Sequence, residues 1–140
     1  MASFIFNSAL YDEAKGSIDY DTDAFKVMLL TSTAAPNKDT WTKRSDVTNE
    51  VSGTGYTAGG ATVTVTVGVV DTANDRVDVS LGGNTWTTST ITARYAVYYK
   101  SRGGAASADE LVAVIDFTTD KTSTGADFAL SASTLRKSNP

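Results

Sequence analysis

The side chains that most often carry chemistry in proteins are missing from this chain. Its 140 residues include no histidine and no cysteine. Histidine is the only side chain whose unperturbed pKa lies in the physiological range, and the cysteine thiolate is a strong nucleophile and a soft metal ligand. Serine nucleophiles lack a histidine base, and no Ser-x-x-Lys spacing occurs. The composition therefore argues against an enzyme.

Carboxylates remain as candidates for chemistry, and one group has a suggestive spacing. Asp19, Asp21 and Asp23 alternate as they do at the start of a calcium loop. An EF-hand would then need glycine and glutamate at positions that hold Ala24 and Leu30. We expect a solvated acidic turn before a buried strand, with a calcium site as the alternative.

A second group of acids lies near apolar segments. Asp109 and Glu110 stand at the start of an apolar run, and Asp116 follows an isoleucine. Two carboxylates at a defined separation would support glycoside hydrolysis, but nothing in the sequence fixes such a pair. We expect these acids to be solvated at strand ends and to have no catalytic role.

A glycine-rich segment matches a nucleotide-binding fingerprint as a string of letters. It reads Gly53-x-Gly55-x-x-Ala58. That motif works only when a helix follows it and presents its N-terminus to the pyrophosphate, whereas a valine-rich strand follows here. We interpret the segment as a loop, and we expect no catalytic residue, no cofactor and no bound metal.

Bulk properties exclude further classes. The formal net charge is −4, whereas nucleic-acid-binding domains are usually basic. No apolar run reaches the roughly 20 residues that span a bilayer, and the first residues lack the pattern of a signal peptide. We therefore expect a protein made in a cytoplasm that binds neither nucleic acid nor membrane.

The elements that would position any site are mostly strands. Residues 61–67 alternate alanine or valine with threonine, which puts the apolar side chains on one face of a strand. With the turn at 71–75 they predict a hairpin over 61–81. Other predicted elements are a helix at 8–16, capped by Ser8 and ended by Gly16, one helical turn within 42–47, and strands at 24–31, 91–99, 110–117 and 126–131.

This pattern predicts a mainly β protein. The whole chain, 1–140, is expected to form a single-domain antiparallel β-sandwich that is jelly-roll-like and has a short N-terminal helix. Residues 1–7 would form an arm and 135–140 a tail, both extended. Trp41 and Trp86 stand in polar surroundings, where a large ring serves either an interface or the closed end of the sandwich.

Several segments together resemble a known family. They are Asp-Ala-Phe-Lys-Val-Met-Leu-Leu-Thr-Ser at 23–32, Val-Thr-Asn-Glu-Val-Ser-Gly-Thr-Gly-Tyr-Thr-Ala-Gly-Gly at 47–60, Ala-Arg-Tyr-Ala-Val-Tyr-Tyr-Lys at 93–100 and Leu-Val-Ala-Val-Ile-Asp-Phe at 111–117. The segments 6–10 and 16–19 belong to the same pattern. In this order they resemble small virion proteins of tailed bacteriophages, and most closely the capsid cement, or decoration, proteins.

The resemblance implies a function as well as a fold. It implies a jelly-roll-like homodimer on the capsid exterior that bridges neighbouring copies of the major capsid protein. No catalytic residue comes with the family. The alternatives are a tail or baseplate component and a carbohydrate-binding module displayed on the virion. From expected exposure, we place the interface on Phe4, Phe6, Trp41, Arg44, Trp86, Arg136 and Lys137.

Overall fold

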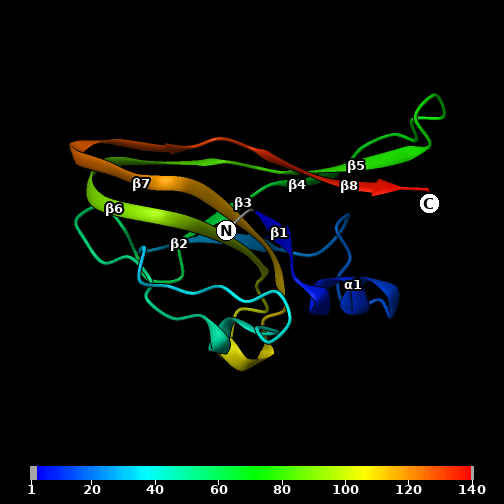
Figure 1. Ribbon diagram of the computed structural model, residues 1–140, viewed down its shortest axis with the longest axis horizontal. Coiled ribbons are helices and arrows are strands. Elements are labelled where there is room, and N and C mark those ends of the chain that lie inside the picture. The colour runs from blue at the N-terminus through cyan, green and yellow to red at the C-terminus, as the bar shows by residue number, and fades with distance from the viewer. Residues whose placement is uncertain (1–2, 140) are drawn as a thin grey trace.

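Two antiparallel β-sheets and one short helix make up the part of the protein that the structure describes (Figure 1). The computed structural model describes residues 3–139. The five-stranded sheet has the order β1-β7-β6-β2-β3, and the three-stranded sheet has the order β4-β5-β8. The strands are β1 (Phe4–Ile5), β2 (Phe25–Leu30), β3 (Ala61–Val63), β4 (Val65–Val67), β5 (Arg76–Leu81), β6 (Asn84–Lys100), β7 (Leu111–Leu130) and β8 (Ser133–Ser138). The prediction of a mainly β, antiparallel sandwich is confirmed.

The helical elements are short. Helix α1 (Asn7–Ala14) follows β1, and the single turns η1 (Arg44–Asp46) and η2 (Ala106–Ala108) lie in connections. The predicted helix is therefore confirmed, but its cap is not. Phe6 occupies the N-cap position without a side-chain hydrogen bond, and Ser8 lies inside the helix. Gly16 follows the helix at φ +82°, a conformation that glycine adopts without strain.

One long two-stranded ribbon forms the frame of both layers. Strands β5 and β8 pair with Leu81 opposite Ser133, and β6 and β7 continue in the same register with Asn84 opposite Leu130. The ribbon then bends sharply, at the end of the molecule on the left of Figure 1. Its two arms lie over each other and enclose the core, and the phenolic hydroxyl of Tyr98 donates across it to the carbonyl oxygen of Gly82 (2.9 Å).

The bend itself is held by buried hydroxyl groups. The register of β6 against β7 shifts on both sides of Ser89, and Thr88 has a positive φ of 49°. The Oγ of Ser89 lies 2.8 Å from the Oγ of Ser123 and within hydrogen-bond distance of the carbonyl oxygens of Trp86 and Ala126. A buried bulge of this kind supplies polar partners for backbone groups that leave the ladder.

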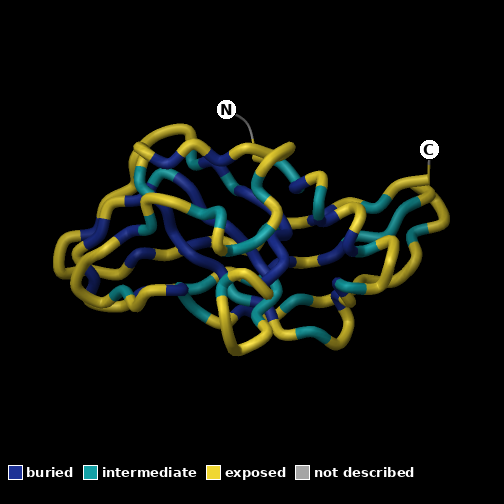
Figure 2. Tube along the Cα trace, turned by 90° about the horizontal axis from the view of Figure 1, so that it is seen from below, coloured by how far each residue is buried: buried dark blue, intermediate teal, exposed yellow. Residues whose placement is uncertain are grey.

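The core lies between the arms and extends under the five-stranded sheet, as the dark blue segments of Figure 2 show. Strand β2 contributes side chains to both faces: Val27, Met28, Leu29 and Leu30 are all buried. This matches the near-continuous apolar run expected for a strand covered on both sides. The glycine-rich segment 53–60 forms turns and no strand, as the sequence predicts.

The predicted hairpin at 61–81 is half correct. Strand β4 does pair with β5, but β3 pairs with β2 in the other sheet. The chain changes sheet at Thr64, whose carbonyl oxygen accepts from Gly82 N. An alternating pattern is compatible with a strand of either sheet, so the sequence does not predict that the chain passes from one sheet to the other at this point.

The two ends of the chain are strands and not loose extensions. Within the predicted arm 1–7, Phe4 and Ile5 pair with β7 and Phe6 is fully buried; residues 1 and 2 lie outside the described range. Within the predicted tail 135–140, β8 pairs along all of β5, and Leu135 is 5% exposed. Pro140 lies outside the described range. In the described residues, both ends are therefore extended as strands that complete the sheets.

Candidate functional site

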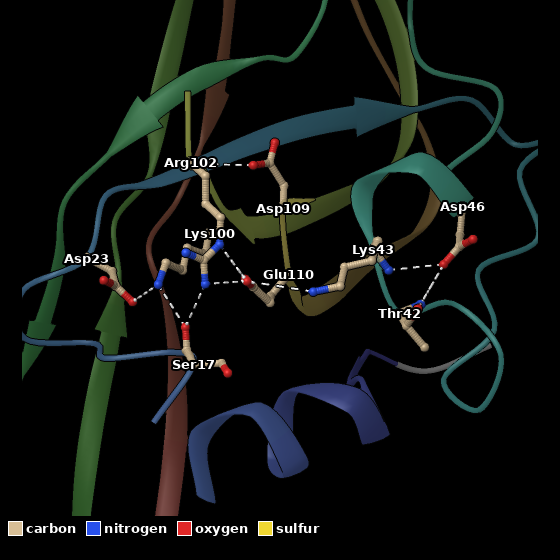
Figure 3. Close-up of polar contacts among 9 residues, drawn as sticks. All are labelled: Ser17, Asp23, Thr42, Lys43, Asp46, Lys100, Arg102, Asp109 and Glu110. Carbon is tan, nitrogen blue, oxygen red and sulfur yellow. Dashed lines mark hydrogen bonds and ion pairs between the residues drawn. The ribbon is translucent and has the colours of Figure 1, made fainter. Parts of the chain in front are cut away.

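A cluster of polar side chains lies where three distant segments meet (Figure 3). Residues 17–23 precede β2, residues 42–46 include η1, and residues 100–110 connect β6 to β7. Backbone hydrogen bonds join the last two segments: Arg44 N donates to the carbonyl oxygen of Asp109 (2.9 Å) and Leu111 N donates to that of Thr42 (3.2 Å). The cluster is therefore a junction between loops.

Asp109 is the buried centre of one half of this cluster. Its side chain is 1% exposed and accepts from the Nε of Arg44 (2.7 Å) and from the backbone N of Arg102 (2.8 Å). The Arg44 guanidinium also lies 5.3 Å from the ring centre of Tyr99. A charge-assisted hydrogen bond to a buried carboxylate orders both partners. Arg44 is thus committed to an internal contact.

Glu110 is the centre of the other half. Its carboxylate is 2% exposed, accepts from the Nε of Arg102 (2.7 Å) and has the ammonium of Lys43 at 3.7 Å. Burial alone would raise the pKa of Glu110, but the Arg102 hydrogen bond and the two positive charges outweigh it and lower the pKa below its usual value. Glu110 is therefore held ionised, which is unsuitable for a general acid.

The acidic turn at 19–23 belongs to the same junction. Asp19 accepts from the backbone N of Asp21 (2.9 Å), and this bond, together with one from Thr22, lowers the pKa of Asp19. Asp23 pairs with the ammonium of Lys100 (2.8 Å). These carboxylates bind the chain's own amides and cations. In the described part of the chain, no group of three or more acidic side chains is arranged to hold a metal ion.

Asp116 lies apart from the cluster, on β7. It accepts from the Nε of Arg94 (2.8 Å) and from the backbone N of Thr118 (2.7 Å). Burial opposes ionisation, but these two bonds lower the pKa of Asp116. Asp19, Asp23, Asp109, Glu110 and Asp116 therefore each have a partner within the chain, and these contacts join loops and strands.

The predicted interface residues do not form one surface. Phe4, Phe6 and Trp41 come together: the rings of Phe4 and Phe6 are 5.3 Å apart, and those of Phe6 and Trp41 are 6.5 Å apart and nearly parallel. Phe6 is fully buried, whereas Phe4 and Trp41 are half-buried. Only part of this aromatic cluster is accessible to a partner.

Trp86 is also inside the protein. It is 6% exposed and packs between Tyr56 and Phe128, with ring centres 5.9 and 6.1 Å away. Of the two roles expected for this ring, its burial fits the closed end of the sandwich and not an exposed interface, because Trp86 occupies an inward position of β6 whose polar neighbours point outward. Its role is to fill the core near the bend.

The two cations of the predicted basic tail, Arg136 and Lys137, form ion pairs with side chains of neighbouring elements. The Nε of Arg136 lies 3.0 Å from Asp78 Oδ1, and the ammonium of Lys137 pairs with the carboxylate of Glu13. Arg136 remains exposed and Lys137 is half-buried. These cations therefore join β8 to β5 and to α1.

The sequence-based expectations missed one exposed surface. Val67, Val69 and Val70 are 41%, 90% and 70% exposed, and the turn that follows them projects from the end of the molecule near the C-terminus (Figure 1). We call residues 65–70 the valine edge. The sequence did contain an indication of this surface, because residues 61–70 include no charged residue and no proline. Exposed strands usually carry one or the other.

Comparison with known proteins assigns the chain to no family. No protein-family model matches the chain, and no curated protein or solved structure matches it significantly. Among the residues that the structure describes, none of the helices has the length and apolar character needed to cross a membrane.

Proposed function

We propose that this protein is a structural component of a bacteriophage virion that binds the outside of the capsid and cements neighbouring major capsid protein subunits. It acts as a homodimer, has no enzymatic activity and uses no cofactor. It is made in the cytoplasm of the host bacterium and binds neither nucleic acid nor membrane. The partner comes from the sequence resemblance, which runs in order through most of the chain.

The observation that carries the proposal is the contrast between the inside and the surface of the fold. Buried carboxylates such as Asp109 and Glu110 are clamped by arginines, so the loops they join are fixed. Large apolar side chains are nevertheless exposed at the valine edge and on α1, where Leu10 and Tyr11 are 52% and 65% exposed. Protein interfaces have centres that are depleted of charge and enriched in aromatic side chains.

A fixed frame suits a cementing protein for an energetic reason. A partner surface that is already ordered loses little conformational entropy on binding. When one molecule contacts two neighbouring subunits, the first contact raises the local concentration for the second. Modest contacts at each joint then add up over the shell without a single strong site.

The two alternatives differ in what they need from the structure. A tail or baseplate component would use the same kind of surface, so only its location on the particle separates it from a cement. A carbohydrate-binding module would need an exposed aromatic face for stacking. Trp86 has none, since its ring is 6% exposed and packs against Phe128, so a sugar would have to stack on the half-buried Trp41 or on Tyr11, which is 65% exposed.

Co-sedimentation of purified protein with phage parts tests the proposal. DNA-emptied heads and isolated tails of the phage that encodes the protein are each stripped of it and then titrated with it. We expect saturable binding to heads at a high copy number and no binding to tails. Saturable binding to tails alone would refute the capsid assignment and establish the tail alternative.

A further inference from the structure

Strand β4 is an open edge of the three-stranded sheet. In the described chain its only hydrogen-bonded neighbour is β5, and residues 66–70 are all exposed. Natural proteins protect such edges with charges, prolines or covering segments, because the edge is a template for pairing with another chain. The valine edge has neither charge nor proline.

The backbone of β4 shows which groups face outward. Gly82 N donates to the carbonyl oxygen of Thr64, and Gly68 N donates to that of Asp78. Hydrogen-bonded and non-hydrogen-bonded positions alternate along an antiparallel pair. Thr64, Thr66 and Gly68 therefore bond to β5 and its extension, and the N–H and C=O groups of Val65 and Val67 point away from the sheet.

We propose that a second copy of this chain pairs with the valine edge, antiparallel and across a twofold axis at Val67. Val67 then lies opposite the partner's Val67, and this pair exchanges both backbone hydrogen bonds. The two three-stranded sheets become one continuous sheet. The inference rests on the proposed function for the expectation of a dimer, and it adds the face.

The side chains are compatible with this symmetry. Val67 lies opposite the buried Val79 on β5, so it points to the inner side of the sheet, and Thr66 points to the outer side. In the dimer, valines meet valines on the inner side.

Charge selects this edge over the other edge of the same sheet. A twofold axis along a strand brings identical residues into opposition, so a charged strand meets its own charge. Strand β8 carries Arg136 and Lys137, whereas the valine edge carries no charge. A second copy of a chain with net charge −4 thus approaches the valine edge without opposed like charges at the contact.

Single cysteines test the register, since the chain has no cysteine of its own. Opposed residues in a hydrogen-bonded antiparallel pair have Cα atoms about 5.5 Å apart, which is within the range of a disulfide. Under mild oxidation we expect Val67→Cys to give a covalent dimer. Val65→Cys should give none, because the two introduced cysteines would lie four residues apart along the paired strands. Ser80→Cys, which is exposed on β5 one strand inward, is the control.

Charge variants test the same contact without a cross-link. By analytical ultracentrifugation we expect the unmodified protein to be a dimer. Val67→Lys should weaken it about tenfold or more, because two ammonium groups are then opposed, and Thr66→Lys on the outer side should have a much smaller effect. A protein that is monomeric throughout, or a dimer unaffected by these variants, would overturn the inference. A valine-edge dimer that fails to bind heads would instead refute only the cementing function.

Discussion

Replacing Leu135 by alanine tests whether the C-terminal strand is part of the fold. Leu135 is 5% exposed on β8, directly opposite Val79, which is 3% exposed. Truncation of a buried leucine removes its burial and leaves a cavity, at a cost of about 3 kcal/mol in the free energy of unfolding. For a chain of this length that corresponds to a fall in Tm of about 10 °C.

The matched control is the same substitution on the surface. Leu10 on α1 is 52% exposed, so Leu10→Ala should change the free energy of unfolding by no more than about 0.5 kcal/mol. Urea unfolding followed by the fluorescence of Trp41 and Trp86 measures both variants. If Leu135→Ala were no more destabilising than Leu10→Ala, β8 would not be docked on β5 and the ribbon frame would be wrong.

Two further predictions follow from the core and from the polar cluster. Gly60→Ala should destabilise the protein by about 2 kcal/mol or more, because φ is +78° and the new Cβ would lie 1.8 Å from the carbonyl oxygen of Val27. Gly103→Ala, at φ +79° with open space around it, should cost about 1 kcal/mol, and equal costs measured by urea unfolding would contradict the close approach. Glu110→Gln should be most destabilising near pH 7. Because the Arg102 pair lowers the pKa of folded Glu110, its contribution is present above the unfolded pKa of about 4.3 and is lost as the pH falls through the folded pKa. If the urea midpoints of the unmodified protein and of Glu110→Gln differed by the same amount at every pH down to 3, the pH-dependent contribution of Glu110 would be excluded.

The fold class was predictable where apolar side chains have a clear period. Residues 24–31 form an apolar run of strand length and residues 61–67 alternate as a strand does, and β2, β3 and β4 lie there. The long ribbon was not predictable, because residues 118–125 consist mainly of threonine, serine and charged residues. Such a segment is a strand only through pairing with β6, which local periodicity does not report.

The candidate site was likewise predictable only in part. The acids at 109, 110 and 116 were expected at strand ends in solvent, but they are buried, since Arg44, Arg102 and Arg94 reach them from 8 to 65 positions away. Pairing over such separations depends on tertiary structure. The exposure of the valine edge likewise depends on β4 being the last strand of its sheet.

The most direct test of the cementing function is DNA retention by heated particles. Phage heads lacking this protein, the same heads with purified protein added back, and complete particles are heated side by side while DNA release is measured. We predict that the deficient heads release DNA at a lower temperature and that the added protein restores the temperature of complete particles. Equal release temperatures for deficient and complete particles would contradict the account.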